Sequence, residues 1–256
     1  MITCFLQGGL GNQMFQIAAT AVLASENDDI AVFDSKNHNL PLQGRKTVNY
    51  MDNIFRNINF SEDIKVTKVY KEEDFSFNKI PYEKELALHG YFQSEKYFQK
   101  QKQYIKELFS PTDEIKRYLL GKYPEILEKN ISSIHVRRGD YLKLKHIHPP
   151  CSLKYYLEAI KKVKSDHFFV FSDDPDWCKQ IFKSNKYTVI SEEQDYNEMY
   201  LMSMCKNNII ANSSFSWWAA WLNNNEDKIV VAPKEWFGPA AKMSCQDIVP
   251  DEWLRL

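Results

Sequence analysis

Short apolar runs alternate with amphipathic stretches along most of this 256-residue chain. Apolar and β-branched runs that are bounded by polar residues predict buried strands. Between these runs, apolar positions recur at helical spacing, as at Leu153, Leu157 and Ile160. Such alternation is typical of an α/β fold with parallel sheets. We predict strands over residues 1–7, 30–34, 132–136, 167–172, 188–190, 208–211 and 229–231.

Capping residues mark the starts of several predicted helices. Ser152 precedes one amphipathic stretch, and Asp174 followed by Pro175 begins another. Asp195 and Glu198 have the spacing of a capping box, with Asp in place of Ser or Thr. These signals place helices directly after the predicted strands.

The pattern weakens in two places. Residues 37–80 are polar with mixed charges, and they predict only short helices and loops. Residues 122–130 form a charged connection with little periodicity, which predicts a domain boundary. We therefore predict two Rossmann-like halves that face a cleft, with domains at 1–126 and 127–256.

Composition narrows the function classes. The chain is 44% hydrophobic, which is ample for a large core, and its net charge of −1 provides no global field for nucleic acid or an anionic membrane. Its five cysteines are scattered without CxxC spacing, which disfavours a disulfide framework or a zinc site. No signal peptide and no membrane-spanning run is recognisable. We expect a cytoplasmic protein that binds any anion through local groups.

The strongest candidate for chemistry is the segment HVRRGDY at 135–141, which follows a predicted strand. Ligands of open α/β sheets bind just beyond the carboxyl ends of strands. The guanidinium groups of Arg137 and Arg138 are permanently charged and suit a bidentate grip on phosphate. Asp140 relieves only part of their mutual repulsion, so a dianionic ligand such as a pyrophosphate is expected beside them. The alternative interpretation is a solvated basic turn.

A glycine-rich turn from Gly8 to Asn12 separates the first strand from a helix predicted over residues 12–25. Glycines let a ligand approach the backbone, and a helix start offers free amides and a positive dipole end. Asn12 and Gln13 add amides that suit phosphate or sugar hydroxyls. Met14 stands where a dinucleotide fingerprint needs its third glycine, which disfavours an NAD-dependent enzyme. A tight structural turn is the alternative.

Two more segments follow predicted strands. Asp173 is placed to accept hydrogen bonds from ribose hydroxyls or guanine nitrogens, whereas Asp174 is already used as a helix cap. The segment NSSFSWWAAWL at 212–222 opens a helix with a hydroxyl-rich turn, which is a natural phosphate seat. Trp218 and Trp221 in that helix are expected to pack in the core.

A sugar site is suggested by the segment Gly90 to Glu95, whose aromatic rings can stack on a sugar while Gln93 binds its hydroxyls. Core packing of these rings is an equally good interpretation. His146 and His148 follow the arginine motif on a predicted loop and are candidates to meet an acceptor. The alternative is that they are inert loop histidines.

Together these segments resemble the family 11 glycosyltransferases, the bacterial α-1,2-fucosyltransferases. The resembling blocks are GGLGNQMFQ at 8–16, HGYFQSEKYF at 89–98, HVRRGDY at 135–141, FSDDPDWC at 171–178 and NSSFSWWAAWL at 212–222. The His-x-Arg-Arg-x-Asp pattern alone is shared with α-1,6- and protein O-fucosyltransferases. The resemblance implies a GT-B fold and transfer of L-fucose from GDP-β-L-fucose to the 2-hydroxyl of a terminal galactose. It implies inversion, no obligatory metal and no cofactor besides the donor.

The resemblance also implies residue roles. The expected catalytic residues are Arg137 and Arg138, facing the donor, and Asp140, which would orient them. The expected donor-binding residues are Gly9, Gly11, Asn12, His135, Arg137, Arg138, Asp173, Ser213, Ser214, Phe215 and Ser216. The expected acceptor contacts are Gln13, Gln93, His146 and His148. No single general base stands out among Asp140, His146, His148 and Glu95.

Three other functions stay open on the sequence alone. They are a fucosyltransferase of another linkage such as α-1,6, a non-catalytic protein that binds a GDP-sugar or a glycan, and the disfavoured NAD-dependent oxidoreductase. A lipid-linked O-antigen repeat is one candidate acceptor, and it would bring the protein to the inner face of the membrane without an anchor. The sequence does not predict whether the acceptor galactose is β1,3- or β1,4-linked, or the oligomeric state.

Overall fold

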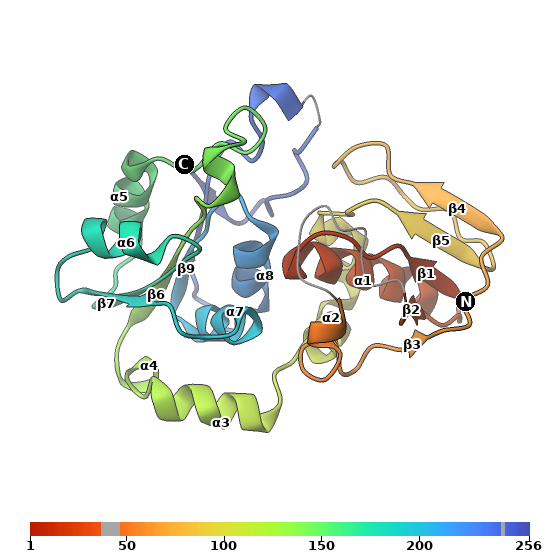
Figure 1. Ribbon diagram of the computed structural model, residues 1–256, viewed down its shortest axis with the longest axis horizontal. Coiled ribbons are helices and arrows are strands. Elements are labelled where there is room, and N and C mark those ends of the chain that lie inside the picture. The colour runs from red at the N-terminus through yellow and green to blue at the C-terminus, as the bar shows by residue number, and fades with distance from the viewer. Residues whose placement is uncertain (37–46, 242–243) are drawn as a thin grey trace. The chain divides into compact units, whose positions relative to one another are not determined.

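A computed structural model of the chain describes residues 1–36, 47–241 and 244–256 (Figure 1). The chain divides into two compact units. The N-terminal unit comprises Met1–Pro111 and Met243–Pro250, and the C-terminal unit comprises Thr112–Lys242 and Asp251–Leu256. The sequence placed a single division between residues 126 and 127, whereas the chain here passes between the units at 111/112 and again near the C-terminus.

Helix α3 (Asp113–Lys122) belongs to the C-terminal unit and is bonded to the segment that leads into helix α7 (Asp195–Met204). The Glu193 carboxylate accepts hydrogen bonds from Lys122 Nζ at 2.6 Å and from the hydroxyls of Tyr118 and Tyr123 at 3.1 and 3.0 Å. Residues 122–130 show little hydrophobic periodicity, so the sequence did not predict these contacts. The short helix α4 (Glu125–Glu128) then leads into the sheet.

The C-terminal unit is built on a six-stranded sheet with the order β11-β10-β9-β6-β7-β8, in which every pairing is parallel. Its strands are β6 (Ile131–Val136), β7 (His167–Ser172), β8 (Tyr187–Ile190), β9 (Asn207–Ile209), β10 (Val230–Ala232) and β11 (Leu254–Arg255). The chain runs outward from β6 to β8, then returns to the other side of β6 with β9. This is a doubly wound order whose switch point lies between β6 and β9.

Four helices connect these strands. They are α5 (Leu153–Lys162), α6 (Pro175–Ile181), α7 (Asp195–Met204) and α8 (Ser214–Leu222). Figure 1 shows α5 and α6 on one face of the sheet and α7 and α8 on the other. The predicted caps Ser152 and Asp174 are confirmed, since each accepts a hydrogen bond of 3.2 Å from the backbone N–H three residues later. The predicted capping box is wrong, because Gln194 occupies the cap and Asp195 is the first helical residue.

Helix α8 forms the centre of the core on its face of the sheet. Trp217, Trp218 and Trp221 are buried, and the rings of Trp217 and Trp218 lie 5.2 Å apart. Trp253, near the end of the chain, packs on Trp217 at 5.4 Å. The prediction that Trp218 and Trp221 are core residues is confirmed.

The N-terminal unit holds a smaller parallel sheet, β1-β5-β4, and a parallel pair, β2-β3. The strands are β1 (Ile2–Cys4), β2 (Phe33–Asp34), β3 (Phe60–Ser61), β4 (Lys68–Lys71) and β5 (Leu86–His89). A parallel bridge between Ile2 and Ala31 joins β1 to the segment leading into β2. Strands β2 and β5 therefore flank β1 on opposite sides, and the direction of winding changes between β1 and β5.

Helix α1 (Leu10–Ser25) starts two residues earlier than predicted, with Gly9 at its cap. Of its 16 residues 13 are buried, so it forms the core of its unit. Gly8 has a φ of +79°, and a Cβ there would lie 2.4 Å from Asn12 Nδ2. The turn before the helix therefore requires glycine at this position.

The remaining elements of the N-terminal unit are short. They are the 3-10 turns η1 (Thr47–Tyr50), η2 (Glu95–Tyr97) and η3 (Gln99–Gln101) and helix α2 (Lys102–Leu108). The prediction of short helices and loops for residues 37–80 missed β3 and β4, and its part at 37–46 lies outside the described residues. The C-terminal unit also contains the 3-10 turns η4 (Asp140–Leu142) and η5 (Pro239–Ala241).

Candidate active site

The carboxyl ends of β6, β7 and β9 bring three predicted segments to one edge of the C-terminal sheet. Strand β6 leads into Arg137 and Arg138, β7 leads into Asp173, and β9 leads into the serine-rich turn 212–216. Since β6 lies between β7 and β9 and all three are parallel, these segments are neighbours at the switch point. This is the edge where open α/β sheets bind ligands.

Arg137 is enclosed by two carboxylates. Its Nη2 lies 2.7 Å from Asp140 Oδ1, and its Nη1 lies 3.0 Å from Asp173 Oδ2. The guanidinium also lies over the Tyr141 ring, 5.3 Å from its centroid. Two carboxylates thus surround the positive charge of Arg137. One of them belongs to Asp140, the residue expected to orient the arginines.

Arg138 is held in a different way. Its Nε donates to Asp174 Oδ2 at 3.0 Å, and its guanidinium stacks on the Trp177 indole at 4.1 Å from the ring centroid. These contacts use one nitrogen and the flat face, and they leave the terminal nitrogens to other partners. Trp177 was missed from the sequence, although it lies three residues after the recognised helix cap Asp174.

Asp173 shapes the arginine turn. Its Oδ1 accepts a hydrogen bond from the Arg138 backbone N–H at 2.9 Å, while Oδ2 contacts Arg137. A Cβ on Gly139 would lie 2.5 Å from Asp173 Oδ2, so a side chain there would displace this carboxylate. Both oxygens therefore serve the turn in this structure, and the expected contact between Asp173 and guanosine stays a prediction.

His135, the next-to-last residue of β6, is buried. Its ring lies 5.5 Å from that of Phe215, and its carbonyl accepts a hydrogen bond from the Tyr156 hydroxyl at 3.1 Å. Burial, with the nearby Arg137 charge, lowers the pKa of His135 to about 3. The imidazole is therefore neutral near neutral pH, and within the described part of the chain its Nδ1 has no hydrogen-bond partner.

The serine-rich turn is fixed from below. The amide of buried Asn212 donates to two loop carbonyls at 3.0 Å each. Ser213 is the cap residue of α8, and Ser213, Ser214 and Phe215 are half-buried. Ser216 is fully buried, and its hydroxyl donates to the Ser213 carbonyl at 3.4 Å. The expected phosphate contacts of Ser213, Ser214, Phe215 and Ser216 stay a prediction.

The structure separates the two loop histidines. The half-buried ring of His148 stacks on Tyr141 at 5.0 Å, so it lies beside the ring that underlies Arg137. Burial lowers the pKa of His148, which favours its neutral form. The His146 side chain is exposed, and its carbonyl accepts a hydrogen bond from the Ala240 N–H at 3.1 Å.

In the N-terminal unit, the carboxyl ends of β1 and β5 bring the glycine turn and the segment after β5 together. Gln93 Nε2 donates to Asn12 Oδ1 at 2.8 Å. Gln13 Nε2 donates to the Gly8 carbonyl at 2.9 Å, and its Oε1 accepts from the Thr47 hydroxyl at 2.8 Å. Both glutamines are buried and brace the turn, and their expected contacts with an acceptor stay a prediction.

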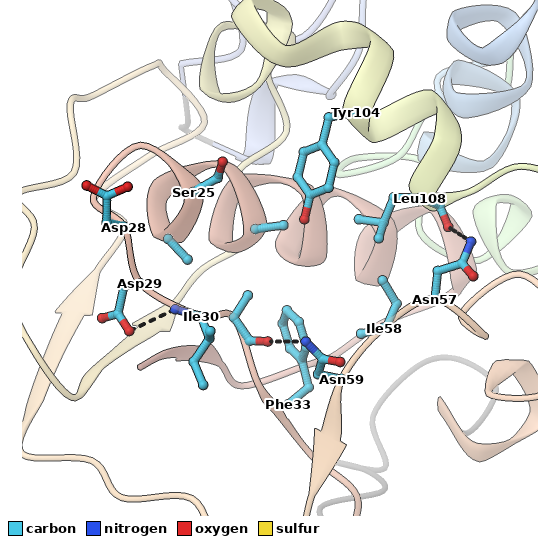
Figure 2. A pocket seen from close by; sticks show the side chains of 13 residues that line it. Ser25, Asp28, Asp29, Ile30, Phe33, Asn57, Ile58, Asn59, Tyr104 and Leu108 are labelled. Atoms are coloured by element: carbon cyan, nitrogen blue, oxygen red, sulfur yellow. Dashed lines mark hydrogen bonds between the residues drawn. The ribbon is translucent and has the colours of Figure 1, made fainter.

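A cavity of about 390 Å³ also lies in the N-terminal unit (Figure 2). It is bounded by the end of α1, by residues 28–33 and 57–59, and by Tyr104 and Leu108 of α2. Its strand-side residues precede β2 and β3, so the cavity lies at the amino ends of those strands. The glycine turn follows the carboxyl end of β1, so the cavity and the candidate site lie at opposite edges of the sheet.

In residues 1–36, 47–241 and 244–256, no helix has the length and apolar character to cross a bilayer. Within the same ranges, no three His, Cys, Asp or Glu side chains gather as a metal site would require.

The fold and site define an α/β protein with two parallel-sheet units. In the C-terminal unit, Arg137 and Arg138 lie at the sheet edge where open α/β sheets bind ligands. Solved fucosyltransferases of the GT-B fold share this architecture. The NodZ fucosyltransferase from Bradyrhizobium aligns with a TM-score of 0.57 and 13% identity, over 85% of this chain and 92% of its own. POFUT1 in complex with GDP-fucose aligns at 0.55 and 11%, over 89% and 94%. At such identities the likeness shows the fold alone.

The family model of glycosyl transferase family 11 matches residues 1–256, and the chain belongs to this family. An alpha-1,2-colitosyltransferase of Escherichia coli is 33% identical, covering 100% of this chain and 99% of its own. The O-antigen biosynthesis glycosyltransferase WbnK of the same species is 31% identical, covering 100% of both. A galactoside 2-alpha-L-fucosyltransferase of Caenorhabditis elegans is 25% identical, covering 100% and 79%. The expected family and fold are confirmed.

Proposed function

We propose that this glycosyltransferase transfers L-fucose from GDP-β-L-fucose to the 2-hydroxyl of a terminal β-galactoside, with inversion and without a metal. The observation that carries the proposal is the pair Arg137 and Arg138 at the switch point of the C-terminal sheet. Family membership and the α-1,2 activities in the names of its relatives support it.

In the proposed reaction, the bond between fucose C1 and the β-phosphate oxygen breaks while galactose O2 attacks C1 from the opposite face. Positive charge develops on the sugar, and negative charge develops on departing GDP. Fixed donors that meet developing charge are usually a large catalytic contribution. Arg138, braced by Asp174 and Trp177, offers its terminal nitrogens to this leaving group, and the start of α8 adds backbone amides and hydroxyls.

The other expected residues divide by unit. His135 and Asp173 are proposed to contact the nucleoside, with His135 as a neutral imidazole. Gly9, Gly11 and Asn12 are proposed to approach the transferred sugar. The proton of the attacking hydroxyl needs only a weak base in a dissociative reaction. Of the candidates, Asp140 and His148 are the ones that lie beside Arg137 or the ring beneath it.

A second donor has specific support. A colitosyltransferase is among the more similar relatives, and colitose is fucose without its 3-hydroxyl. We therefore propose GDP-colitose as the alternative donor at the same site. The acceptor is proposed to be a galactose-terminated glycan, with a lipid-linked O-antigen repeat as one form, reached by peripheral contact with the membrane.

The test is turnover by purified protein of both donors, against β1,3- and β1,4-linked galactosides, with and without EDTA. The expected product carries fucose on galactose O2, and EDTA leaves the rate unchanged. A product linked elsewhere would replace the α-1,2 assignment. GDP binding without transfer to any acceptor would favour a binding protein, and preference for colitose would favour the second donor.

A further inference from the structure

Glu72 lies at the carboxyl end of β4, and its carboxylate holds the segment that follows β5. Its Oε2 accepts a hydrogen bond from the Tyr91 N–H at 2.6 Å, and its Oε1 accepts one from the Phe92 N–H at 2.9 Å. Two consecutive backbone amides thus converge on one carboxylate. The parallel pairing of β4 with β5, which sets Lys71 opposite His89, brings these groups together.

The segment after β5 is built around this contact. A Cβ on Gly90 would lie 2.3 Å from the Cβ of Glu72, so only glycine fits there without displacing the chain. Phe92 has a φ of +53° in the left-handed region, and its ring is fully buried. Such a conformation is strained for a residue other than glycine, and it persists where surrounding contacts enforce it. The carboxylate of Glu72 supplies two of those contacts.

The next residue connects this segment to the candidate site. Gln93 follows Phe92 directly, and its side chain donates to Asn12 in the glycine turn at 2.8 Å. Asn12 lies at the start of α1, beside the backbone that is proposed to approach the transferred sugar. The chain of contacts therefore runs from Glu72 through the amides of Tyr91 and Phe92 to Gln93 and then to Asn12.

We propose that Glu72 is a positioning residue of the active site, whose carboxylate fixes the amides of Tyr91 and Phe92 and thereby sets Gln93 and Asn12 for transfer. The inference rests on the proposed function and deepens it. No covalent step is assigned to Glu72. Its action depends on the negative charge, because a protonated carboxyl keeps only one good acceptor oxygen for two N–H donors.

The charge is poised to change near neutral pH. Burial raises the pKa of Glu72 to about 7, with a smaller contribution from Asp74, while the hydrogen bonds from Phe92 and Tyr91 act in the opposite direction. The two hydrogen bonds from the Tyr91 and Phe92 amides to the Glu72 carboxylate form a clamp. This clamp is intact above this pH and weakens as the pH falls through it. Besides Asp74, the titratable groups of the described residues that interact with Glu72 include Cys4, Tyr70, Tyr91 and Tyr97.

The first experiment compares wild type, Glu72→Gln and the control Glu73→Gln, which removes an exposed carboxylate from the adjacent position. Rates of fucosyl transfer are measured between about pH 5.5 and about pH 8.5. Wild type and the control should lose kcat as the pH falls through about 7. Glu72→Gln should lower kcat about tenfold at high pH and flatten this limb, with little change in KM for the donor. A limb unchanged in Glu72→Gln would overturn the proposal.

A second measurement does not depend on the reaction. Hydrogen exchange of peptides covering residues 90–93, corrected for intrinsic rates, should slow in wild type as the pH rises through about 7 and stay fast in Glu72→Gln. Gly90→Ala, which forces the chain off Glu72 while keeping the carboxylate, should reproduce the fast exchange if Glu72→Gln fails to fold. Equal protection in all variants would refute the clamp. Wild-type protein that shows the exchange change but transfers no fucose would refute the proposed function alone.

Discussion

The two sheets share one topological feature and differ in the chemistry placed on it. In each unit the winding reverses beside a central strand, β1 or β6, and candidate residues gather at the carboxyl ends there. The C-terminal edge carries two guanidinium groups with three carboxylates around them. The N-terminal edge carries neutral amide side chains held by hydrogen bonds, and the Glu72 carboxylate bonds the adjacent backbone. Topology thus fixes where a site forms, while the loops fix what it binds.

The difference suits the two partners of the proposed reaction. A pyrophosphate leaving group needs positive charge that is already in place, and guanidinium groups supply it. Sugar hydroxyls are recognised by neutral donors and acceptors whose positions are fixed in advance. If this division holds, changes at the C-terminal edge alter GDP affinity, and changes at the N-terminal edge alter kcat with GDP affinity preserved.

The largest effect is expected from Arg138→Ala. Loss of a charge-assisted grip on the β-phosphate should lower kcat/KM for GDP-fucose about a hundredfold or more. Arg138→Lys should restore little, since an ammonium group has no flat face to stack on Trp177 while it bonds Asp174. The control is Arg117→Ala, an exposed arginine on α3.

Arg137→Ala should also lose turnover while remaining folded, because its removal leaves Asp140 and Asp173 without their shared cation. Circular dichroism checks the fold, and nucleotide release checks the rate. Wild-type turnover in both single arginine variants would end the assignment of this edge to the donor.

A smaller effect is expected from Trp177→Leu. A cation–π contact of this geometry contributes about 0.5–2 kcal/mol, so GDP affinity should fall up to about thirtyfold as Arg138 loses its support. Trp177→Phe should retain most of the affinity. Calorimetric titration with GDP measures both variants, and equal affinities for Leu and Phe would show that stacking is not what positions the guanidinium.

Gln93→Ala tests the opposite edge. Loss of its hydrogen bond to Asn12, about 1 kcal/mol, should lower kcat about fivefold and leave GDP affinity unchanged. Gln103→Ala, an exposed glutamine on α2, is the matched control. A fall in GDP affinity with unchanged kcat would reverse the proposed division between the edges.

The smallest effect concerns stability and pH. The folded-state pKa of His135 lies below its ordinary value, so the unfolded chain binds a proton first and acid favours unfolding. Between pH 7 and pH 6 this group should cost about 0.7 kcal/mol of unfolding free energy. Urea unfolding at both pH values, for wild type and His135→Asn, measures the difference. For global unfolding Glu72 has the opposite sign, because burial raises its folded-state pKa and its contribution is therefore greatest in acid and lost as the pH rises towards 7. Within the folded state its hydrogen bonds from Tyr91 and Phe92 lower that pKa, so these two bonds strengthen when the carboxyl ionises.

The sequence predicted best what local pattern controls. Strands β6, β7, β9 and β10 of the C-terminal sheet are largely buried runs. The caps Ser152 and Asp174 act through residues three positions away. The arginine motif was located because it follows such a strand. Strand β4, by contrast, is largely exposed and lysine-rich, so no hydrophobic pattern marked it.

Contacts that depend on strand register could not be predicted from the sequence. Glu72 meets Tyr91 only because β4 pairs with β5, and Trp177 meets Arg138 only because α6 starts beside the end of β6. Gln13 and Gln93 were recognised as polar groups near a ligand edge, but their hydrogen bonds turn inward. The sequence alone does not distinguish a polar residue that binds a ligand from one that positions a neighbouring ligand-binding residue.

Residues 244–250 lie near the end of the chain but belong to the N-terminal unit, which matters when the two units are recombined. The Asp247 carboxylate accepts a hydrogen bond from the Phe77 N–H at 2.8 Å and pairs with Lys96, and the Ser244 hydroxyl bonds that of Ser76 at 2.7 Å. A fragment that stops at residue 111 therefore lacks part of its own fold. A chimera between relatives that aims to exchange donor and acceptor preferences has to carry 1–111 and 244–250 from the same parent, so the gene needs three junctions where the two-unit architecture suggests one.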